Sequence, residues 1–251
     1  MRRRAFDLDL RFPAGSGSLS NLVYFGECFE WENINLIRRY LRPGDRVVDV
    51  GGNVGMFTYA CAQATAPDGQ VHVFEPLTWA AEVITDNVER NGLDRRVTVH
   101  PVAVADREGF VGFATDLDVS SHIQLVPGAA NARVMDVPTS TLDAVLPAGP
   151  IALAKIDVEG AEALVLTGFG EHLAAANPPV LIIEADRASL KHLRSSRDQV
   201  LAKLKEFGYE PYLYDVAASR FVPLPADSNA DVVAIHTAAL PMARERLHAR
   251  I

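Results

Sequence analysis

Residues 47–55 read VVDVGGNVG, an apolar strand pattern that runs directly into a glycine-rich turn. Asp49 is the charged residue of the strand, and it lies two positions before Gly51. A turn without side-chain bulk lets backbone N–H groups approach a ligand closely, at the positive end of the helix that follows. Glu75 ends the next apolar run, where an acidic side chain can accept hydrogen bonds from a ribose diol. Together these features predict a nucleoside-containing cofactor.

The spacing of the turn separates two kinds of nucleoside. A dinucleotide fingerprint, G-x-G-x-x-G, would require glycine where this chain has Asn53 and Met56. S-adenosylmethionine has no pyrophosphate to cradle, and a carboxylate near the turn can receive its ammonium group. The pattern D-x-G-x-N-x-G therefore favours S-adenosylmethionine, although glycine turns after strands also occur without a ligand.

Length and composition exclude several classes of protein. The 251 residues can bury a full core, and 49% hydrophobic with 22% charged residues is ordinary for a globular enzyme. The net charge of −8 argues against a general nucleic-acid binder. No apolar run approaches the roughly 18 to 20 residues that cross a bilayer, so we expect no membrane partner. Arg2 to Arg4 precede no signal-like segment and are expected to form a solvated tail of a cytoplasmic protein. Cys28 and Cys61 have no metal or redox spacing and are expected to stay reduced.

Strand and helix patterns alternate along the chain, which favours a mostly parallel sheet with helices on both faces. The predicted helices span residues 54–66, 77–91 and 197–207, after an N-terminal piece, 19–41, that ends in a helical pattern. The predicted strands span residues 46–50, 71–74, 97–100, 151–156, 180–184, 209–214 and 232–236. The last two are expected to pair through a long connection. Residues 106–140 are less regular, with a short strand at 110–114 and an extended piece near 134–137.

This order predicts an α/β fold: a single Rossmann-like class I methyltransferase domain with a seven-stranded, mostly parallel sheet and an antiparallel last strand. Residues 1–41 are expected to be an N-terminal extension and helix on the acceptor side, and residues 42–251 the S-adenosylmethionine-binding domain. In such a sheet the ligand lies at the carboxyl ends of the strands, at the switch in strand order. Acidic residues end or nearly end four predicted strands there: Asp49, Glu75, Asp157 and Glu184.

Several motifs together resemble the FkbM family of S-adenosylmethionine-dependent methyltransferases, over about residues 25–185. The most specific is KIDVEGAE at residues 155–162, and the glycine turn alone would suit many methyltransferases. The others are PGD at 43–45, VDVGGNVG at 48–55, VFEP at 73–76, Asn87 to Asn91, VAVAD at 102–106, Ser120-Ser121 and TLD at 141–143. Gly52 stands where alanine is usual in the family, a change that we expect to be harmless.

The resemblance implies a set of cofactor-binding residues. Asp49, Gly51 and Asn53 would line the methionine end of S-adenosylmethionine, and Glu75 would hold the ribose hydroxyls. The remaining implied contacts, around the adenine and near the first helix, are Pro76, Leu77, Val102, Ala103 and Glu30. Val102 replaces an acid that is often found at its position, so its backbone N–H would serve in place of that acid.

Methyl transfer is an in-line displacement, so most of its catalysis is proximity and alignment. An alcohol acceptor must also lose a proton, which a nearby carboxylate or histidine can take. Asp157 is the first candidate for this base or for orienting the acceptor, and His122 on the irregular loop is the second. Plainer roles remain open for the neighbours: His122 as a surface residue, Glu159 as a cap or charge complement at a helix start, and Glu162 as a solvent-facing residue or a partner of Lys155. Ser120 and Ser121 could simply shape a turn.

A metal mechanism is also open. Asp157 and Glu184 end adjacent predicted strands, as two of the metal-holding acids do in catechol-type O-methyltransferases. A Mg²⁺ ion there would bind acceptor oxygens and lower the pKa of the hydroxyl, but the sequence offers no clear third ligand.

The predicted function is O-methylation of a hydroxyl on a small natural product, polyketide or sugar. A protein or nitrogen acceptor is open within the same class of enzyme. Two other classes compete: a catalytically silent cofactor-binding module, which the intact acids disfavour, and a nicotinamide-dependent oxidoreductase, which the missing third glycine disfavours. No motif identifies the acceptor or predicts the oligomeric state.

Overall fold

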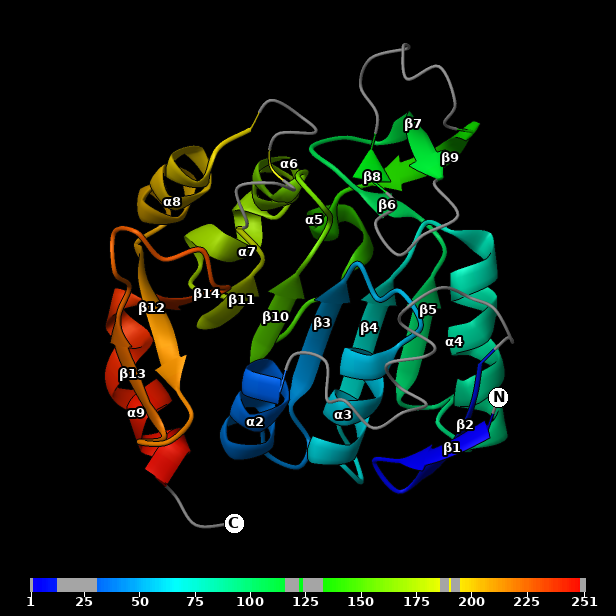
Figure 1. The fold of residues 1–251 in the computed structure, drawn as a ribbon, viewed down its shortest axis with the longest axis horizontal. Coiled ribbons are helices and arrows are strands. Elements are labelled where there is room, and N and C mark those ends of the chain that lie inside the picture. Colours follow the sequence, from blue (N-terminus) through cyan, green and yellow to red (C-terminus); the bar gives the residue numbers. More distant parts are fainter. Residues whose placement is uncertain are drawn as a thin grey trace.

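The computed structural model describes residues 2–12, 31–115, 122–123, 133–185, 190 and 195–248. Its central sheet contains eight described strands. They are β3 (Arg46–Val50), β4 (Gln70–Phe74), β5 (Val97–His100), β10 (Leu153–Ile156), β11 (Val180–Ile183), β12 (Tyr209–Asp215), β13 (Arg220–Pro223) and β14 (Val232–His236). Their order across the sheet is β13-β12-β14-β11-β10-β3-β4-β5 (Figure 1). The strand order therefore switches direction between β3 and β10.

The directions of the strands confirm the predicted class. Strands β5, β4, β3, β10 and β11 pair in parallel, whereas β14 runs antiparallel to both of its neighbours, β11 and β12. The predicted count of seven strands is wrong by one, because β13 adds an antiparallel edge strand beside β12. Pro223 and Pro225 suggested a long irregular connection here, but proline is compatible with an edge strand.

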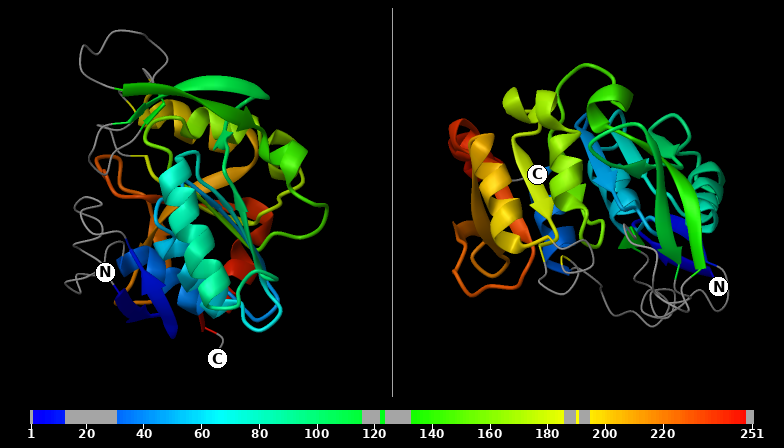
Figure 2. Two further views of the ribbon diagram at one scale, coloured as in Figure 1. Left: turned by 90° about the vertical axis from the view of Figure 1, so that its right-hand side faces the viewer. Right: turned by 90° about the horizontal axis from the view of Figure 1, so that it is seen from above.

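Helices cover both faces of the sheet, as Figure 2 shows from two directions. They are α2 (Trp31–Tyr40), α3 (Met56–Ala64), α4 (Thr78–Arg90), α5 (Leu142–Val145), α6 (Glu162–Thr167), α7 (Gly170–Ala174), α8 (Arg197–Glu206) and α9 (Leu240–His248). Alternate strand residues point to opposite faces. Val47 and Leu153 accordingly pack with α2, α3, α4 and α9, whereas Val48 and Ala154 pack with α5 to α8.

A second, smaller sheet lies beyond the carboxyl ends of β3, β4 and β5 in Figure 1. It consists of β6 (Ala103–Val104), β7 (Gly109–Thr115), β8 (His122–Ile123) and β9 (Arg133–Ser140), in the order β6-β9-β7-β8. The predicted extended pieces at 110–114 and 134–137 are confirmed as β7 and β9, which pair antiparallel. A small apolar cluster joins this sheet to the starts of α4 and α6: Leu77, Ala80, Ala103, Val137 and Ala161.

The N-terminal residues form a hairpin where we expected a solvated tail. Strand β1 (Arg2–Ala5) pairs antiparallel with β2 (Leu8–Arg11), and Leu10 is fully buried. The Asn87 amide on α4 exchanges two hydrogen bonds with the backbone of Arg11, of 2.7 and 2.9 Å. The hairpin thus packs against α4, near the C-terminal end of that helix. A contribution of residues 1–41 to acceptor binding stays a prediction, and residues 13–30 lie outside the described part of the chain.

The turn after β3 fits only because its glycines lack side chains. Gly51 has a φ of +85°, and a Cβ there would lie 1.8 Å from the carbonyl oxygen of Asp157. A Cβ on Gly52 would lie 2.2 Å from Cγ2 of Val73. Glycine at position 52 is thus required in this chain rather than merely tolerated, because the β4 neighbour Val73 fills the space that an alanine methyl group would take.

We predict that Gly52→Ala lowers the free energy of unfolding by about 1–3 kcal/mol, the usual cost of forcing a methyl group into a packed site. Urea denaturation measures this cost. Val73→Ala removes the obstructing methyl groups, so the double variant should lose clearly less stability than the sum of the two single variants. Strictly additive losses would show that the overlap at Val73 is not the cause.

Candidate active site

Acidic side chains lie together at the carboxyl ends of the central strands, which we call the carboxyl edge of the sheet. The residue after each strand continues the ladder by one hydrogen bond. Glu75 N–H donates to the carbonyl of His100 (3.1 Å), Asp157 N–H to that of Val50 (3.0 Å) and Glu184 N–H to that of Ile156 (3.0 Å). Parallel strands bring their carboxyl ends to a common edge, so the ladder fixes these three side chains as neighbours. The switch in strand order, between β3 and β10, lies in the middle of this edge (Figure 1).

The N–H groups of the glycine turn bond within the protein. Those of Gly51 and Gly52 both donate to the carbonyl of Phe74, at 2.9 and 3.1 Å, and that of Gly55 donates to Gly52 at 2.8 Å. The N–H of Asn53 donates to Oε2 of Glu75 at 2.8 Å. These bonds tie the turn to the end of β4, and contact of the turn with a ligand stays a prediction.

Glu75 is the best-placed candidate for holding a diol. Its side chain is 5% exposed, and its two oxygens each accept one backbone N–H, from Asn53 and from Leu77 (2.9 Å). Burial raises the pKa of Glu75 to about 7, against the two N–H bonds that lower it. Each carboxylate oxygen keeps a lone pair for a further donor, such as a ribose hydroxyl.

The residues implied for adenine binding lie beside Glu75. Leu77 and Ala103 are buried in the apolar cluster beneath the second sheet, and Pro76 and Val102 are partly exposed. The N–H of Val102 donates to the carbonyl of His100 at 2.9 Å. The suggestion that this N–H serves the adenine in place of an acid is therefore wrong in this arrangement. The other adenine contacts stay predictions.

Asp49 is fully buried rather than lying at the edge. Its Oδ2 accepts a 2.5 Å hydrogen bond from Thr58 Oγ1 on α3. In the ladder between β3 and β10, Asp49 stands directly opposite Lys155. Direct contact between Asp49 and a ligand stays a prediction. In this structure the Asp49 carboxylate is buried below the glycine turn, on the strand next to the buried Lys155.

Asp157 forms an ion pair with Lys155 at 2.6 Å, whereas the sequence suggested Glu162 as a partner of this lysine. The side chain of Lys155 is 5% exposed and that of Asp157 is 24% exposed, so only the acid reaches the surface. Burial raises the pKa of Asp157, but the Lys155 charge and a hydrogen bond with Glu184 outweigh it and hold that pKa below its usual range. Burial and the charge of Asp157 raise the pKa of Glu184 strongly. Glu184 therefore holds a proton more tightly than Asp157 does.

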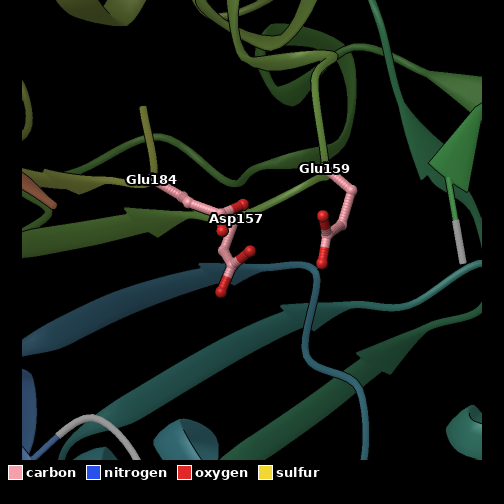
Figure 3. Close-up of side chains that lie close together, drawn as sticks. All are labelled: Asp157, Glu159 and Glu184. Atoms are coloured by element: carbon pink, nitrogen blue, oxygen red, sulfur yellow. The ribbon is translucent and has the colours of Figure 1, made fainter. Parts of the chain in front are cut away.

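A third carboxylate completes a cluster that the sequence did not identify. Oxygens of Asp157, Glu159 and Glu184 lie within 4.8 Å of one another, with Asp157 and Glu184 directed toward each other in Figure 3. Glu159 reaches this position from a left-handed backbone conformation with φ of +54°. Carboxylate oxygens are the ligand type that Mg²⁺ accepts, so the cluster offers the third oxygen group that a metal would need.

Glu162 is buried, where we expected a solvent-exposed residue. It is 1% exposed, and its Oε1 accepts the N–H groups of Val158 (3.2 Å) and Gly160 (3.1 Å). Glu162 therefore binds the turn before α6, the role suggested for Glu159. Burial raises the pKa of Glu162 to about 7, against the bonds from the backbone that lower it.

The described part of the structure does not test four of the predicted residues. His122 belongs to β8, where its backbone pairs with Ala114, and its role as a base stays a prediction. Glu30, Ser120 and Ser121 lie outside the described residues.

The family model described as a methyltransferase FkbM domain matches residues 49–211. The chain belongs to this family. It is 31% identical over 162 residues to the 31-O-demethyl-FK506 methyltransferase FkbM of Streptomyces tacrolimicus, which covers 51% of this chain and 60% of that protein. It is 36% identical over 66 residues to the ribosomal protein L11 methyltransferase of Bacillus pumilus, covering 26% and 21%. The chain thus spans less than two thirds of the length of these curated relatives.

Solved structures support the fold class. A candidate rRNA methylase from Clostridium thermocellum aligns with a TM-score of 0.51 at 13% identity, over 90% of this chain and 97% of that one. A SAM-dependent methyltransferase from Aquifex aeolicus aligns with a TM-score of 0.50 at 14% identity, over 87% and 98%. The Rossmann-like methyltransferase architecture is therefore confirmed. Within the described ranges, no helix combines the length and the apolar character that a membrane crossing needs.

We predict a pH-dependent cost from burying Glu162. A carboxyl whose pKa is higher in the folded chain than in the unfolded chain loses stability as the pH rises between the two values. For Glu162 this window runs from 4.5 to about 7. Across it, the free energy of unfolding of the wild type should fall by up to about 3 kcal/mol relative to Glu162→Gln, whose side chain does not ionise.

Urea denaturation between pH 4.5 and 8 measures this difference. Glu82→Gln, at an exposed position of α4, is the matched control and should follow the wild-type curve. Parallel curves for wild type and Glu162→Gln would mean that Glu162 ionises as freely in the folded chain as in the unfolded chain.

Proposed function

We propose that this protein is an S-adenosylmethionine-dependent methyltransferase that transfers a methyl group to a hydroxyl of a small natural product, polyketide or sugar. The observation that carries the proposal is Asp157: an ionised carboxylate, partly exposed, at the switch between β3 and β10. Membership of the FkbM family supports the reaction class.

In this proposal the cofactor lies across the carboxyl edge of β4, β3 and β10. Glu75 accepts from the ribose hydroxyls, since its carboxylate is fixed by two backbone N–H groups and keeps lone pairs for them. Pro76, Leu77, Val102 and Ala103 surround the adenine. The methionine end lies toward Gly51 and Asn53, with Asp49 beneath them, and Glu30 is a further contact.

Bound S-adenosylmethionine would supply the methyl group, which an acceptor oxygen would take by in-line displacement with S-adenosylhomocysteine as the other product. The hydroxyl proton passes to the Asp157 carboxylate and from there to solvent. An ionised carboxylate within hydrogen-bond reach is suited to this step, which general-base catalysis typically accelerates by about 10²- to 10⁴-fold. Glu184, which holds a proton more tightly than Asp157 does, is not the first candidate for the base. His122 is the second candidate for the base.

Two observations support a small hydroxylated acceptor. The relative from Streptomyces tacrolimicus is named as a methyltransferase of 31-O-demethyl-FK506, a reaction of that protein that provides a precedent for an oxygen acceptor. The net charge of −8 gives no electrostatic attraction for nucleic acid. The second sheet and the N-terminal 41 residues are the candidates for the acceptor side.

We predict that Glu75→Ala weakens S-adenosylmethionine binding by about 1.5–3 kcal/mol, because two hydroxyl groups lose a charged acceptor. Isothermal titration calorimetry with S-adenosylmethionine and with NAD measures this loss and tests the nicotinamide alternative. Glu75→Gln keeps one acceptor oxygen, which can serve one of the Asn53 and Leu77 N–H groups, and should lose less than Glu75→Ala. Unchanged affinity in a folded Glu75→Ala variant would remove Glu75 from the cofactor site.

We predict that Asp157→Asn lowers turnover by about 10²-fold or more while S-adenosylmethionine affinity changes little, since the amide cannot take the proton. The measurement requires the acceptor, which a screen of hydroxylated metabolites with S-adenosylhomocysteine release as readout would identify. If Asp157 and Glu184 hold Mg²⁺ instead, EDTA should abolish wild-type turnover and Mg²⁺ restore it. Near wild-type turnover of Asp157→Asn would refute both roles for Asp157. Release of S-adenosylhomocysteine with no acceptor, or no binding of S-adenosylmethionine, would count against the proposed function itself.

A further inference from the structure

Lys155 occupies an unusual position for a lysine. It lies in the middle of β10, a strand in which every residue is buried, and α3 covers it. Its ammonium lies 5.5 Å from the centre of the Phe57 ring on α3 and 2.6 Å from Oδ2 of Asp157. Burying an ammonium costs several kcal/mol of desolvation unless charged partners compensate it. Lys155 therefore requires acidic partners close to its ammonium.

Two acids are placed to be those partners. Asp49 stands opposite Lys155 on the neighbouring strand β3, and Asp157 directly follows β10, two positions after Lys155. Asp157 contacts the ammonium at the carboxyl end of the strand. Lys155 is thus fixed by packing against Phe57 and by charge, and it approaches Asp157 from beneath.

Carboxyl groups crowd together at the carboxyl ends of β10 and β11. Oxygens of Asp157, Glu159 and Glu184 lie within 4.8 Å of one another, and ionised carboxylates at this distance repel. Enzymes resolve such repulsion with a metal ion, with protons or with a nearby ammonium. In this chain the Lys155 ammonium already donates a short, charge-assisted hydrogen bond of 2.6 Å to Oδ2 of Asp157.

We propose that Lys155 is a positioning residue, a fixed internal cation that holds the Asp157 side chain oriented toward the methyl group in the place that a divalent metal would otherwise take among these carboxylates. This inference rests on the proposed function, because it assigns the base of that reaction its counter-charge. It means that the carboxylate cluster works without a metal ion, since a divalent cation bound to Asp157 would be repelled by the ammonium of Lys155.

The inference is tested by asking whether removing the ammonium creates a metal site. Lys155→Met keeps the length of the side chain and removes its charge. The probe is Mn²⁺ alone, titrated calorimetrically and followed by its electron paramagnetic resonance signal. We expect the wild type to bind Mn²⁺ no tighter than about millimolar and Lys155→Met to bind it at least tenfold tighter, because the carboxylates have lost their internal cation. The gain should disappear in Lys155→Met/Glu184→Gln.

Lys155→Arg is the matched control, since it keeps the charge and should bind Mn²⁺ as weakly as the wild type. Calorimetry with S-adenosylhomocysteine and circular dichroism verify that each variant is folded. If Lys155→Met does not fold, Lys155→Gln takes its place and the expected gain is the same. A purely structural lysine would alter stability in these variants without creating a metal site.

Two outcomes overturn the inference. One is a folded, charge-free variant at position 155 that binds Mn²⁺ no better than the wild type. The other is submillimolar Mn²⁺ binding by the wild type that is lost in Asp157→Asn. Failure of the proposed function shows separately, as an absence of S-adenosylmethionine binding in the wild type, and Mn²⁺ binding does not depend on that result.

Discussion

The turn after β3 passes so close to the end of β10 that no side chain fits between them. A Cβ on Gly51 would lie 1.8 Å from the Asp157 carbonyl oxygen, and this contact is at the switch in strand order. Because the backbones approach so closely, the N–H of Asp157 bonds to Val50, and the Asp157 side chain is directed to the edge beside the turn. The placement of Glu75 follows from the same turn, since the N–H of Asn53 donates to its carboxylate.

Charge at this edge is organised in layers. The deepest layer is a buried ammonium, Lys155, with Asp49 opposite it on the neighbouring strand. Above it lies Asp157, partly exposed and ionised, and beside Asp157 lies Glu184, which holds a proton more tightly. One ammonium thus offsets part of the negative charge that the strand ends bring together, and its direct contact is with Asp157.

Much of the fold could be predicted from the sequence because its strands are short apolar runs bounded by glycine, proline and acidic residues. The edge strand β13, the N-terminal hairpin and helix α9 could not, because their stability comes from contacts with distant elements, such as Asn87 with Arg11. The partner of Lys155 was available in the sequence: residues 155 and 157 are two apart at the end of a strand, where alternate side chains point to the same face. The burial of Glu162 was not, since it depends on how the turn before α6 folds back on its side chain.

The residues that cost stability in this structure are those nearest the proposed chemistry. Glu75 and Glu162 are buried acids with raised pKa values, and Lys155 is a buried base. A sheet stabilised only by apolar packing would have no need of them, and hydrophobic residues of similar size at such positions are often as stable or more so. Two of them hold backbone turns through N–H groups, and the third holds Asp157. Their shared effect is to fix, before any ligand arrives, the positions of the groups that a methyl transfer would use, which is where alignment contributes most to the rate.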